Sequence, residues 1–284
     1  MYVSYWGLSE KPFENTADPK FLYYSRQHEE AFTRLNYAIS EEKGVAVLSG
    51  VFGCGKTLLA QAVLQSLSKG KYETAFIINP YLSHTELLRE ILYGLGIRDN
   101  LPSQKSDILH SLNEVLHNNM DNGKQTVVII DEAHLIEDKL IFEELRLLLN
   151  FQYQNKFLLT LILLGQPELK EKINNIKQFQ QRVAIKYHLS GLSETETAEY
   201  INHRLRTAGG TRKIFDDNSL SPMQKGFFMI LPLLSALSFL IGICWAFLNL
   251  NYWPVLFILV FRKSLIVISL IFFLAGIFRF QSFE

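Results

Sequence analysis

The stretch Gly50-Val51-Phe52-Gly53-Cys54-Gly55-Lys56-Thr57 decides the fold of this chain. Its G-x-x-x-x-G-K-T spacing is typical of a loop that binds phosphate groups. The apolar run 45–49 before it predicts a buried strand, and the apolar positions at helical spacing after it, up to Leu67, predict a helix. A glycine-rich turn that occurred by chance would not be expected to lie between such a strand and such a helix. The sequence therefore predicts a nucleotide site between a strand and a helix.

Each residue type in this loop has an expected role. The glycines allow backbone conformations that turn successive N–H groups toward phosphate oxygens, and the following helix adds the positive end of its dipole. Lys56 brings a full charge to the β- and γ-phosphates, and the Thr57 hydroxyl is suited to ligate Mg2+. ATP and Mg2+ are the predicted ligands, and the predicted nucleotide-binding residues are Gly50, Val51, Phe52, Gly53, Cys54, Gly55, Lys56, Thr57 and Leu58.

The composition divides the chain into two unlike parts. The 284 residues have a formal net charge of zero, but from Met223 onward only five residues are charged and four of these are basic. The two cysteines, Cys54 and Cys244, indicate neither a disulfide framework nor a metal site. Residues 1–6 lack a basic segment followed by an apolar core, so we expect no cleavable signal. A reducing cytosol suits the globular part.

Strands and helices are expected to alternate along the first part of the chain. Apolar runs at 74–79, 127–130, 157–164 and 183–189 predict further strands, and Ser25 and Ser83 are placed to cap helices. Continuous apolar strands favour an α/β fold with a mainly parallel sheet covered on both faces. The aromatic arm 5–25 is expected to pack on this domain, either as a structural clasp or as an edge of the pocket for the nucleotide base.

A second chemical motif follows the predicted strand 127–130. Asp131 and Glu132 come directly after it, at the edge where α/β sheets bind ligands. Asp131 is expected to hold the Mg2+ shell through water, and Glu132 to polarise the water that attacks the γ-phosphate. Alone, two acids after a strand can also begin a helix. His134 completes the letters DEAH, known from helicases, and we interpret it instead as a helix-facing polar residue.

Two further residues are candidates for catalysis. Gln166 follows the predicted strand 157–164, where its amide can contact the attacking water or the γ-phosphate, although a turn residue before Pro167 is an equal alternative. Arg182 lies just before the last strand. It can serve as an arginine finger that reaches a neighbouring subunit's γ-phosphate, or it can be a solvated surface residue.

These motifs, in this order, resemble the AAA+ ATPases. The arm 5–25, His28-Glu29-Glu30-Ala31, Gln166-Pro167-Glu168-Leu169 and the stretch 200–205 look like the general secretion pathway protein A group, the ExeA-type ATPases, over roughly residues 1–220. The resemblance implies ATP hydrolysis, a five-stranded parallel sheet and oligomerisation through the nucleotide site. It also implies a membrane anchor coupled to secretion machinery, and it favours Gln166 as a sensor and Arg182 as a finger.

The chain departs from that family after its sheet. We divide it into an arm and first helix (1–43), an ATPase core (44–190), a partial helical lid (191–222) and a hydrophobic segment (223–284). The family's second sensor arginine, in a Gly-Gly-Ile-Pro-Arg-like stretch, has no counterpart after Leu220. The abrupt change at 221–222 favours the hypothesis that a secretion ATPase core was joined to an unrelated tail by fusion or frameshift.

The hydrophobic segment predicts insertion into a membrane. The stretch 227–250 has 24 uncharged residues, enough to cross a hydrocarbon core of about 30 Å. The runs 252–261 and 264–278 are shorter, and Arg262 and Lys263 separate them, so two spans are favoured over one. ATP binding requires the first part to be cytoplasmic, and Lys225 agrees with the positive-inside tendency. The expected location is the inner membrane.

The predicted function is that of a membrane-anchored ATPase that energises or assembles a secretion system. A homo-oligomer and a membrane partner in the secretion apparatus are expected, and nucleic acid is not. One alternative is a DNA adaptor ATPase of the transposition type, which should show a basic face and no membrane span. Another is a truncated or frameshifted product that binds nucleotide without efficient turnover.

Overall fold

The computed structural model describes residues 2–14, 16–68, 70–99, 101–212 and 214. The chain divides into two units, residues 1–212 and 213–284, and only the first is described below. The predicted hydrophobic segment 223–284, with the spans 227–250, 252–261 and 264–278, lies outside the described residues. Within the described ranges, no helix is long and apolar enough to cross a membrane.

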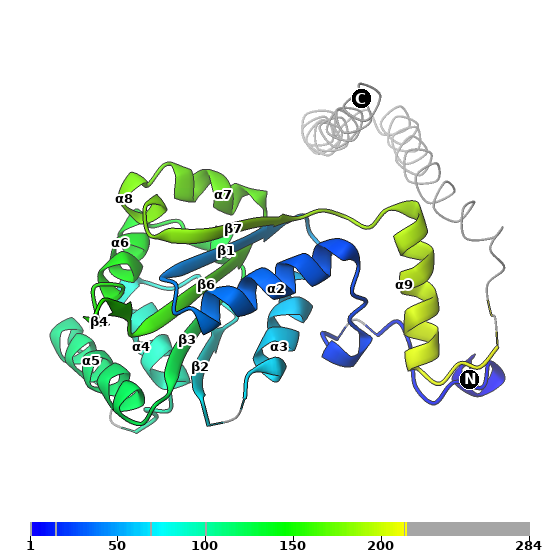
Figure 1. Cartoon of the computed structure of the whole chain (residues 1–284), viewed down its shortest axis with the longest axis horizontal. Coiled ribbons are helices and arrows are strands. Elements are labelled where there is room, and N and C mark those ends of the chain that lie inside the picture. Colours follow the sequence, from blue (N-terminus) through cyan, green and yellow to red (C-terminus); the bar gives the residue numbers. More distant parts are fainter. Residues whose placement is uncertain (1, 15, 69, 100, 213, 215–284) are drawn as a thin grey trace, which may run out of the picture. The chain divides into compact units, whose positions relative to one another are not determined.

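The first unit alternates strands and helices (Figure 1). Its strands are β1 (Val45–Gly50), β2 (Tyr72–Ile77), β3 (Gln125–Ile130), β4 (Gln152–Tyr153), β5 (Lys156–Phe157), β6 (Leu159–Gly165) and β7 (Val183–Leu189). Its α-helices are α1 (Tyr2–Tyr5), α2 (Arg26–Ser40), α3 (Lys56–Ser66), α4 (His84–Gly94), α5 (Lys105–Asp121), α6 (Lys139–Leu148), α7 (Pro167–Asn174), α8 (Lys177–Gln180) and α9 (Glu194–Thr207). Two 3-10 turns are η1 (Pro19–Phe21) and η2 (Ala133–Leu135).

Five of the strands form one parallel sheet in the order β2-β3-β6-β1-β7. This confirms the five-stranded parallel sheet that the family resemblance implied. Strands β1 and β6 are buried along their whole length, because they lie in the middle of the sheet with helices on both faces. The carboxyl ends of all five strands therefore meet at one edge, where the phosphate loop begins.

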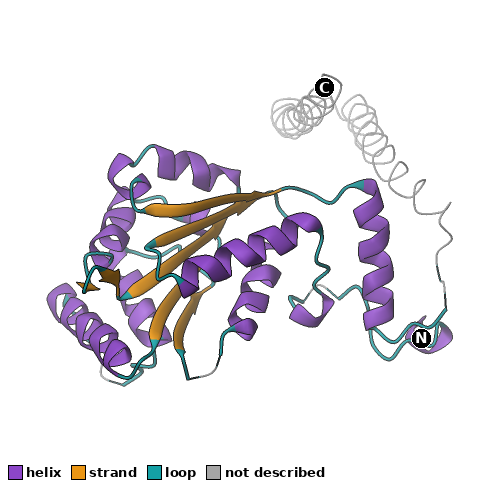
Figure 2. Ribbon diagram, viewed as in Figure 1, coloured by secondary structure: helices purple, strands orange, loops and turns teal. Residues whose placement is uncertain are grey.

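The helices cover the two faces of the sheet unequally (Figure 2). Helices α2 and α3 pack on one face, against alternate residues of β1 such as Ala46 and Leu48. Helices α4 to α8 pack on the other face, against Val45 and Val47. Successive side chains of a strand point to opposite faces, so a strand buried on both faces must be apolar throughout. The prediction of a sheet covered on both faces is confirmed.

Two predicted strands differ from the structure in their bounds. The run 157–164 was expected to be one strand, but Phe157 belongs to the small antiparallel pair β4–β5, and the central strand begins at Leu159. Gln154 and Asn155 join this pair with φ of 48° and 66°, the positive values that a tight two-residue hairpin turn requires. The run 74–79 lies two residues too late, because β2 ends at Ile77 and Ile78 is 66% exposed.

The predicted helix caps at Ser25 and Ser83 are present. Ser25 Oγ accepts the His28 N–H at the start of α2, and Ser83 with Glu86 forms a complete capping box on α4. Ser193 makes the same arrangement with Glu196 on α9, the helix that opens the predicted lid. These caps fix where each helix begins, and α2 begins directly beside the phosphate loop.

Candidate functional site

The phosphate loop joins β1 to α3 in a conformation that needs its glycines. Gly53 and Gly55 have φ of 77° and 88°, a region that other residues rarely adopt. Gly50 is required for a different reason, because a Cβ there would lie 2.5 Å from the Leu189 carbonyl oxygen and 2.8 Å from Cys54 Sγ. Burial raises the pKa of the Cys54 thiol, which keeps it neutral inside the loop.

The remaining loop residues differ in exposure. Val51 and Phe52 are exposed at 41% and 85%. Leu58 is half-buried against the cluster beneath α2 and α3. The predicted residues 50–58 are thus gathered in one turn of chain at the carboxyl edge of the sheet.

Lys56 is buried, with 6% of its surface exposed. Its Nζ donates to the carbonyl oxygens of Gly50 at 3.0 Å and Val51 at 2.9 Å. In the described part of the chain no carboxylate forms an ion pair with it. Because a buried ammonium without a counterion is costly, the site fits an anionic ligand held by the loop.

Thr57 and Asp131 come together from different elements. Thr57 Oγ1 donates to Asp131 Oδ2 at 2.5 Å, and the Glu132 backbone N–H donates to Asp131 Oδ1 at 2.8 Å. The Asp131 residue is only 1% exposed. A hydroxyl and a carboxylate beside a phosphate loop are the oxygen ligands that Mg2+ prefers. The residue set predicted for the metal therefore fits Mg2+.

Glu132 is held in a left-handed conformation, with φ of 50° and ψ of 31°. Such a conformation costs a non-glycine residue about 1–2 kcal/mol, so the surrounding contacts must impose it. His134 lies in the 3-10 turn η2, with Nδ1 3.2 Å from Glu132 Oε2. Lys172 of α7 donates to the His134 and Ile136 carbonyls and holds this turn against the sheet.

Gln166 follows β6, the strand between β1 and β3. It lies at the same edge as the phosphate loop on one side and Asp131 on the other, since Gly165 pairs with Ser49 and Leu163 with Ile130. The half-buried side chain does not cap α7, although Gln166 occupies the N-cap position. Its position is compatible with the predicted sensor role.

Arg182 lies at the opposite edge of the sheet. It precedes β7, whose first residue Val183 pairs with Val45 at the start of β1, whereas the phosphate loop follows Gly50 at the end. Five steps of about 3.3 Å separate the two ends by roughly 17 Å, more than an arginine side chain spans. Its Nη2 donates to Asn150 Oδ1 at 3.2 Å. Arg182 therefore cannot reach the phosphates of its own subunit.

The aromatic arm packs on α9. Ser9 N and Oγ both donate to the Ala208 carbonyl at 2.8 Å, and the Tyr23 hydroxyl donates to Glu199. The Arg204 guanidinium stacks over Phe21 at 5.0 Å. These contacts are those of the clasp that the arm was expected to form. The turn η1 also contacts α3, so the alternative role at the edge of a base pocket remains a prediction.

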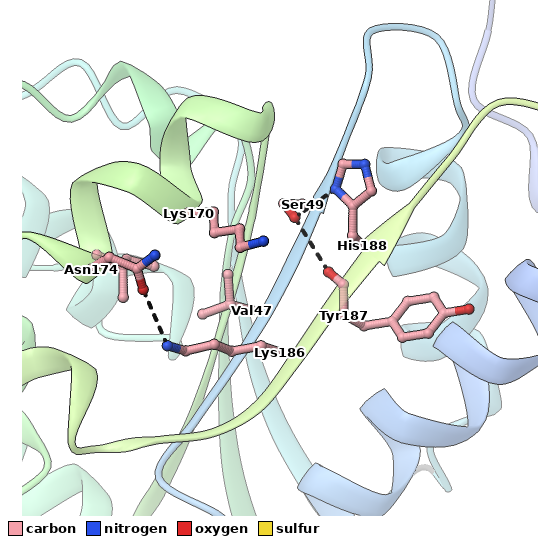
Figure 3. A pocket seen from close by; sticks show the side chains of 8 residues that line it. Val47, Ser49, Lys170, Asn174, Lys186, Tyr187 and His188 are labelled. Carbon is pink, nitrogen blue, oxygen red and sulfur yellow. Dashed lines mark hydrogen bonds between the residues drawn. The ribbon is translucent and has the colours of Figure 1, made fainter. Parts of the chain in front are cut away.

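A separate cavity of about 100 Å3 lies beside the last residues of β1 (Figure 3). Strands β1 and β7 and helix α7 line it, and Lys170, Lys186 and His188 point toward it. His188 Nδ1 is 3.0 Å from Ser49 Oγ, and burial together with Lys170 and Lys56 lowers the pKa of this histidine. None of the predicted nucleotide-binding residues lines this cavity.

Sequence reasoning missed one contact of the loop. His28 is only 5% exposed, and its Nε2 lies 2.9 Å from the Cys54 carbonyl oxygen. The spacing of His28 with the buried residues Ala31 and Leu35 puts it on the core-facing side of α2. A polar residue at a core-facing position is the signal that would have singled it out.

Comparisons with known proteins identify the family of this chain. Residues 39–173 match the family described as AAA domain. General secretion pathway protein A of Aeromonas hydrophila is 36% identical over 232 residues, which cover 79% of this chain and 41% of that protein. The chain thus spans about two fifths of that relative's length.

Solved structures share the fold at low identity. The Aeropyrum pernix ORC2 protein, in ADPNP–ADP complexes, has a TM-score of 0.55 at 20% identity, covering 69% of this chain and 55% of that one. The Aeropyrum pernix ORC1 protein in complex with DNA has a TM-score of 0.57 at 14% identity, covering 74% and 58%.

The parallel sheet, the phosphate loop and the family match define the class: this chain carries an AAA domain of the P-loop ATPase type. Within that class it belongs to the general secretion pathway protein A family, as its motifs predicted.

Proposed function

We propose that this protein binds and hydrolyses Mg-ATP at the edge of the sheet where Lys56, Thr57 and Asp131 meet. The observation that carries the proposal is the buried Lys56 ammonium, whose only hydrogen-bonding partners in the described chain are loop groups, next to the 2.5 Å contact between Thr57 and Asp131. The first feature favours a polyanion and the second favours a hard cation beside it.

Each residue then has one task in hydrolysis. Lys56 and the loop N–H groups neutralise the phosphates, and Thr57 with Asp131 holds Mg2+, which supplies charge stabilisation on the phosphate oxygens when bound. Glu132 orients and polarises the attacking water, and Gln166 contacts the γ-phosphate or that water. The left-handed backbone of Glu132 and the contact with His134 limit the directions in which its carboxylate can point.

We propose that Arg182 acts between subunits. Its distance from the loop of its own chain supports a role in a homo-oligomer, where the arginine of one copy reaches the nucleotide of the next. Mixing variants tests this role, because Arg182→Ala keeps an intact site and Lys56→Ala keeps an intact arginine. Each alone should lose turnover by on the order of 10³-fold, and the mixture should recover part of it. A mixture as inactive as its components would contradict the role.

We propose an ATPase at the inner membrane, with the ATPase domain in the cytoplasm, that energises or assembles a secretion apparatus. The similarity to General secretion pathway protein A supports this proposal, and so does the apolar composition of residues 227–250. Fractionation of cells that express the full chain should place it in the membrane fraction, resistant to extraction by high salt; release by salt would contradict membrane insertion.

The enzymatic proposal is tested on the full chain purified in detergent. Glu132→Gln should retain ATP binding and lose turnover by about 10²-fold or more, whereas Lys56→Ala should lose binding itself. Calorimetry with ATP and Mg2+, together with phosphate release, separates the two effects. Unchanged hydrolysis in the Glu132→Gln protein would remove Glu132 from its role, and binding without turnover by the unmodified chain would favour an inactive nucleotide-binding product.

A further inference from the structure

A buried histidine of α2, His28, contacts the phosphate loop. His28 lies in the first turn of α2, and its side chain reaches the loop that follows β1. His28 Nε2 is 2.9 Å from the Cys54 carbonyl oxygen, and His28 Nδ1 is 2.7 Å from Ser25 Oγ. Both Ser25 and His28 are buried, at 3% and 5% exposure. The three groups form a chain of hydrogen bonds from the helix cap to the loop.

The partners fix which nitrogen donates. A carbonyl oxygen can only accept, so Nε2 must carry hydrogen and donate to Cys54. The other nitrogen, Nδ1, is hydrogen-bonded to the Ser25 hydroxyl, which can donate to the ring or accept from it. Ser25 Oγ in turn accepts the His28 backbone N–H, which is the cap of α2. The ring is therefore held at both nitrogens, in one orientation.

Holding the Cys54 carbonyl also orients the next N–H group. The Cys54–Gly55 peptide is planar and trans, so its C=O and N–H point in opposite directions. Because the Cys54 carbonyl points toward His28, the Gly55 N–H points away from His28, to the opposite side of the loop. The ring also packs against this peptide, since a Cβ on Gly55 would lie 3.4 Å from His28 Nε2.

We propose that His28 is a positioning residue of the nucleotide site: its hydrogen bond to the Cys54 carbonyl aims the Gly55 N–H at the phosphates. The inference rests on the proposed function and deepens it, because it concerns the phosphate part of the ligand alone. It predicts that His28 matters for nucleotides that carry phosphates and not for the nucleoside, because the loop is proposed to hold the phosphates alone.

Three substitutions separate the hydrogen bond from packing. His28→Phe keeps a ring and removes the donor. His28→Gln places an amide N–H near the Nε2 position, whereas His28→Asn places it near Nδ1 and too far from the loop. His110→Ala is the matched control, because His110 is an exposed histidine on α5, across the sheet from the loop.

The experiment measures ADP and adenosine binding by calorimetry on the full chain in detergent, with the melting temperature of each variant. His28→Phe should bind ADP about 5-fold more weakly, the effect of one lost hydrogen bond, with adenosine binding unchanged. His28→Gln should restore ADP binding and His28→Asn should not. If His28→Phe fails to fold, the comparison of ADP affinity between His28→Gln and His28→Asn tests the inference by itself.

Three results would overturn the inference: unchanged ADP affinity in His28→Phe, equal losses for ADP and adenosine, or equal behaviour of His28→Gln and His28→Asn. A wild-type chain that binds no ADP would instead overturn the proposed function, so the two failures are distinguishable.

Discussion

Adding one methyl group at Gly50 should weaken nucleotide binding through steric overlap alone. Gly50 is the last residue of β1 and pairs with Leu189 at the end of β7. A Cβ at this position would lie 2.5 Å from the Leu189 carbonyl oxygen, 2.8 Å from Cys54 Sγ and 3.1 Å from Leu189 Cβ. Favourable contacts between carbon atoms occur near 3.5–4.0 Å, so Gly50→Ala creates overlaps of about 1 Å.

Two parts of the molecule can yield to this methyl group. Strand β7 is hydrogen-bonded to β1, and Leu189 is fully buried, whereas Cys54 belongs to the loop. The loop should therefore shift first. Overpacking of this kind costs about 1–3 kcal/mol. If the strain is relieved only by opening the loop, ATP affinity should fall by about 10-fold, because 1.4 kcal/mol corresponds to a factor of ten.

Two other glycines serve as controls for the assay, which combines calorimetric titration with ATP and thermal unfolding. A Cβ on Gly53 or Gly7 meets nothing within 4 Å, although φ is 77° and 66° at these residues. Gly7→Ala therefore reports the backbone penalty of about 1–2 kcal/mol far from the loop, and Gly53→Ala reports it within the loop. A Gly50→Ala protein with wild-type affinity and melting temperature would refute the reasoning.

Three further predictions concern the metal, the arm and the catalytic turn. Asp131→Asn should abolish the extra thermal stabilisation that Mg2+ adds to ATP, and an undiminished effect of Mg2+ would exclude Asp131 from the metal site. Burial and the hydrogen bond to Glu199 raise the pKa of Tyr23 to about 12, above its usual 10, so its contribution to stability is complete below pH 10 and is lost as the pH rises to 12. Urea unfolding at pH 9 and pH 11 should show a smaller pH effect in Tyr23→Phe, and equal slopes would contradict this. Lys172→Met should lower the free energy of unfolding by about 1.5–3 kcal/mol, because Lys172 holds two carbonyls of the turn after Glu132; denaturant titration without a shift would show that these bonds are dispensable.

The family could be predicted from local patterns in the sequence. The loop 50–57 and the acids at 131 and 132 are short motifs with fixed spacing, and such motifs can be recognised without knowing the order of the strands. The first and last residues of the strands were predicted less accurately from the sequence. Phe157, predicted as the first residue of the strand 157–164, pairs instead in the hairpin β4–β5, whose turn residues Gln154 and Asn155 adopt positive φ although neither is a glycine.

The sequence by itself determined the strand-loop-helix around Lys56, the apolar strands of a sheet covered on both faces, and the helix caps at Ser25 and Ser83. Those features depend on residues close together in the chain. Only the tertiary structure decided that Thr57 contacts Asp131, that His28 holds the Cys54 carbonyl, and that Arg182 lies at the far edge from its own loop. The physical reason is that strand order and register bring together residues many positions apart in the chain. The hydrophobic periodicity of a single segment does not predict which strand lies beside it.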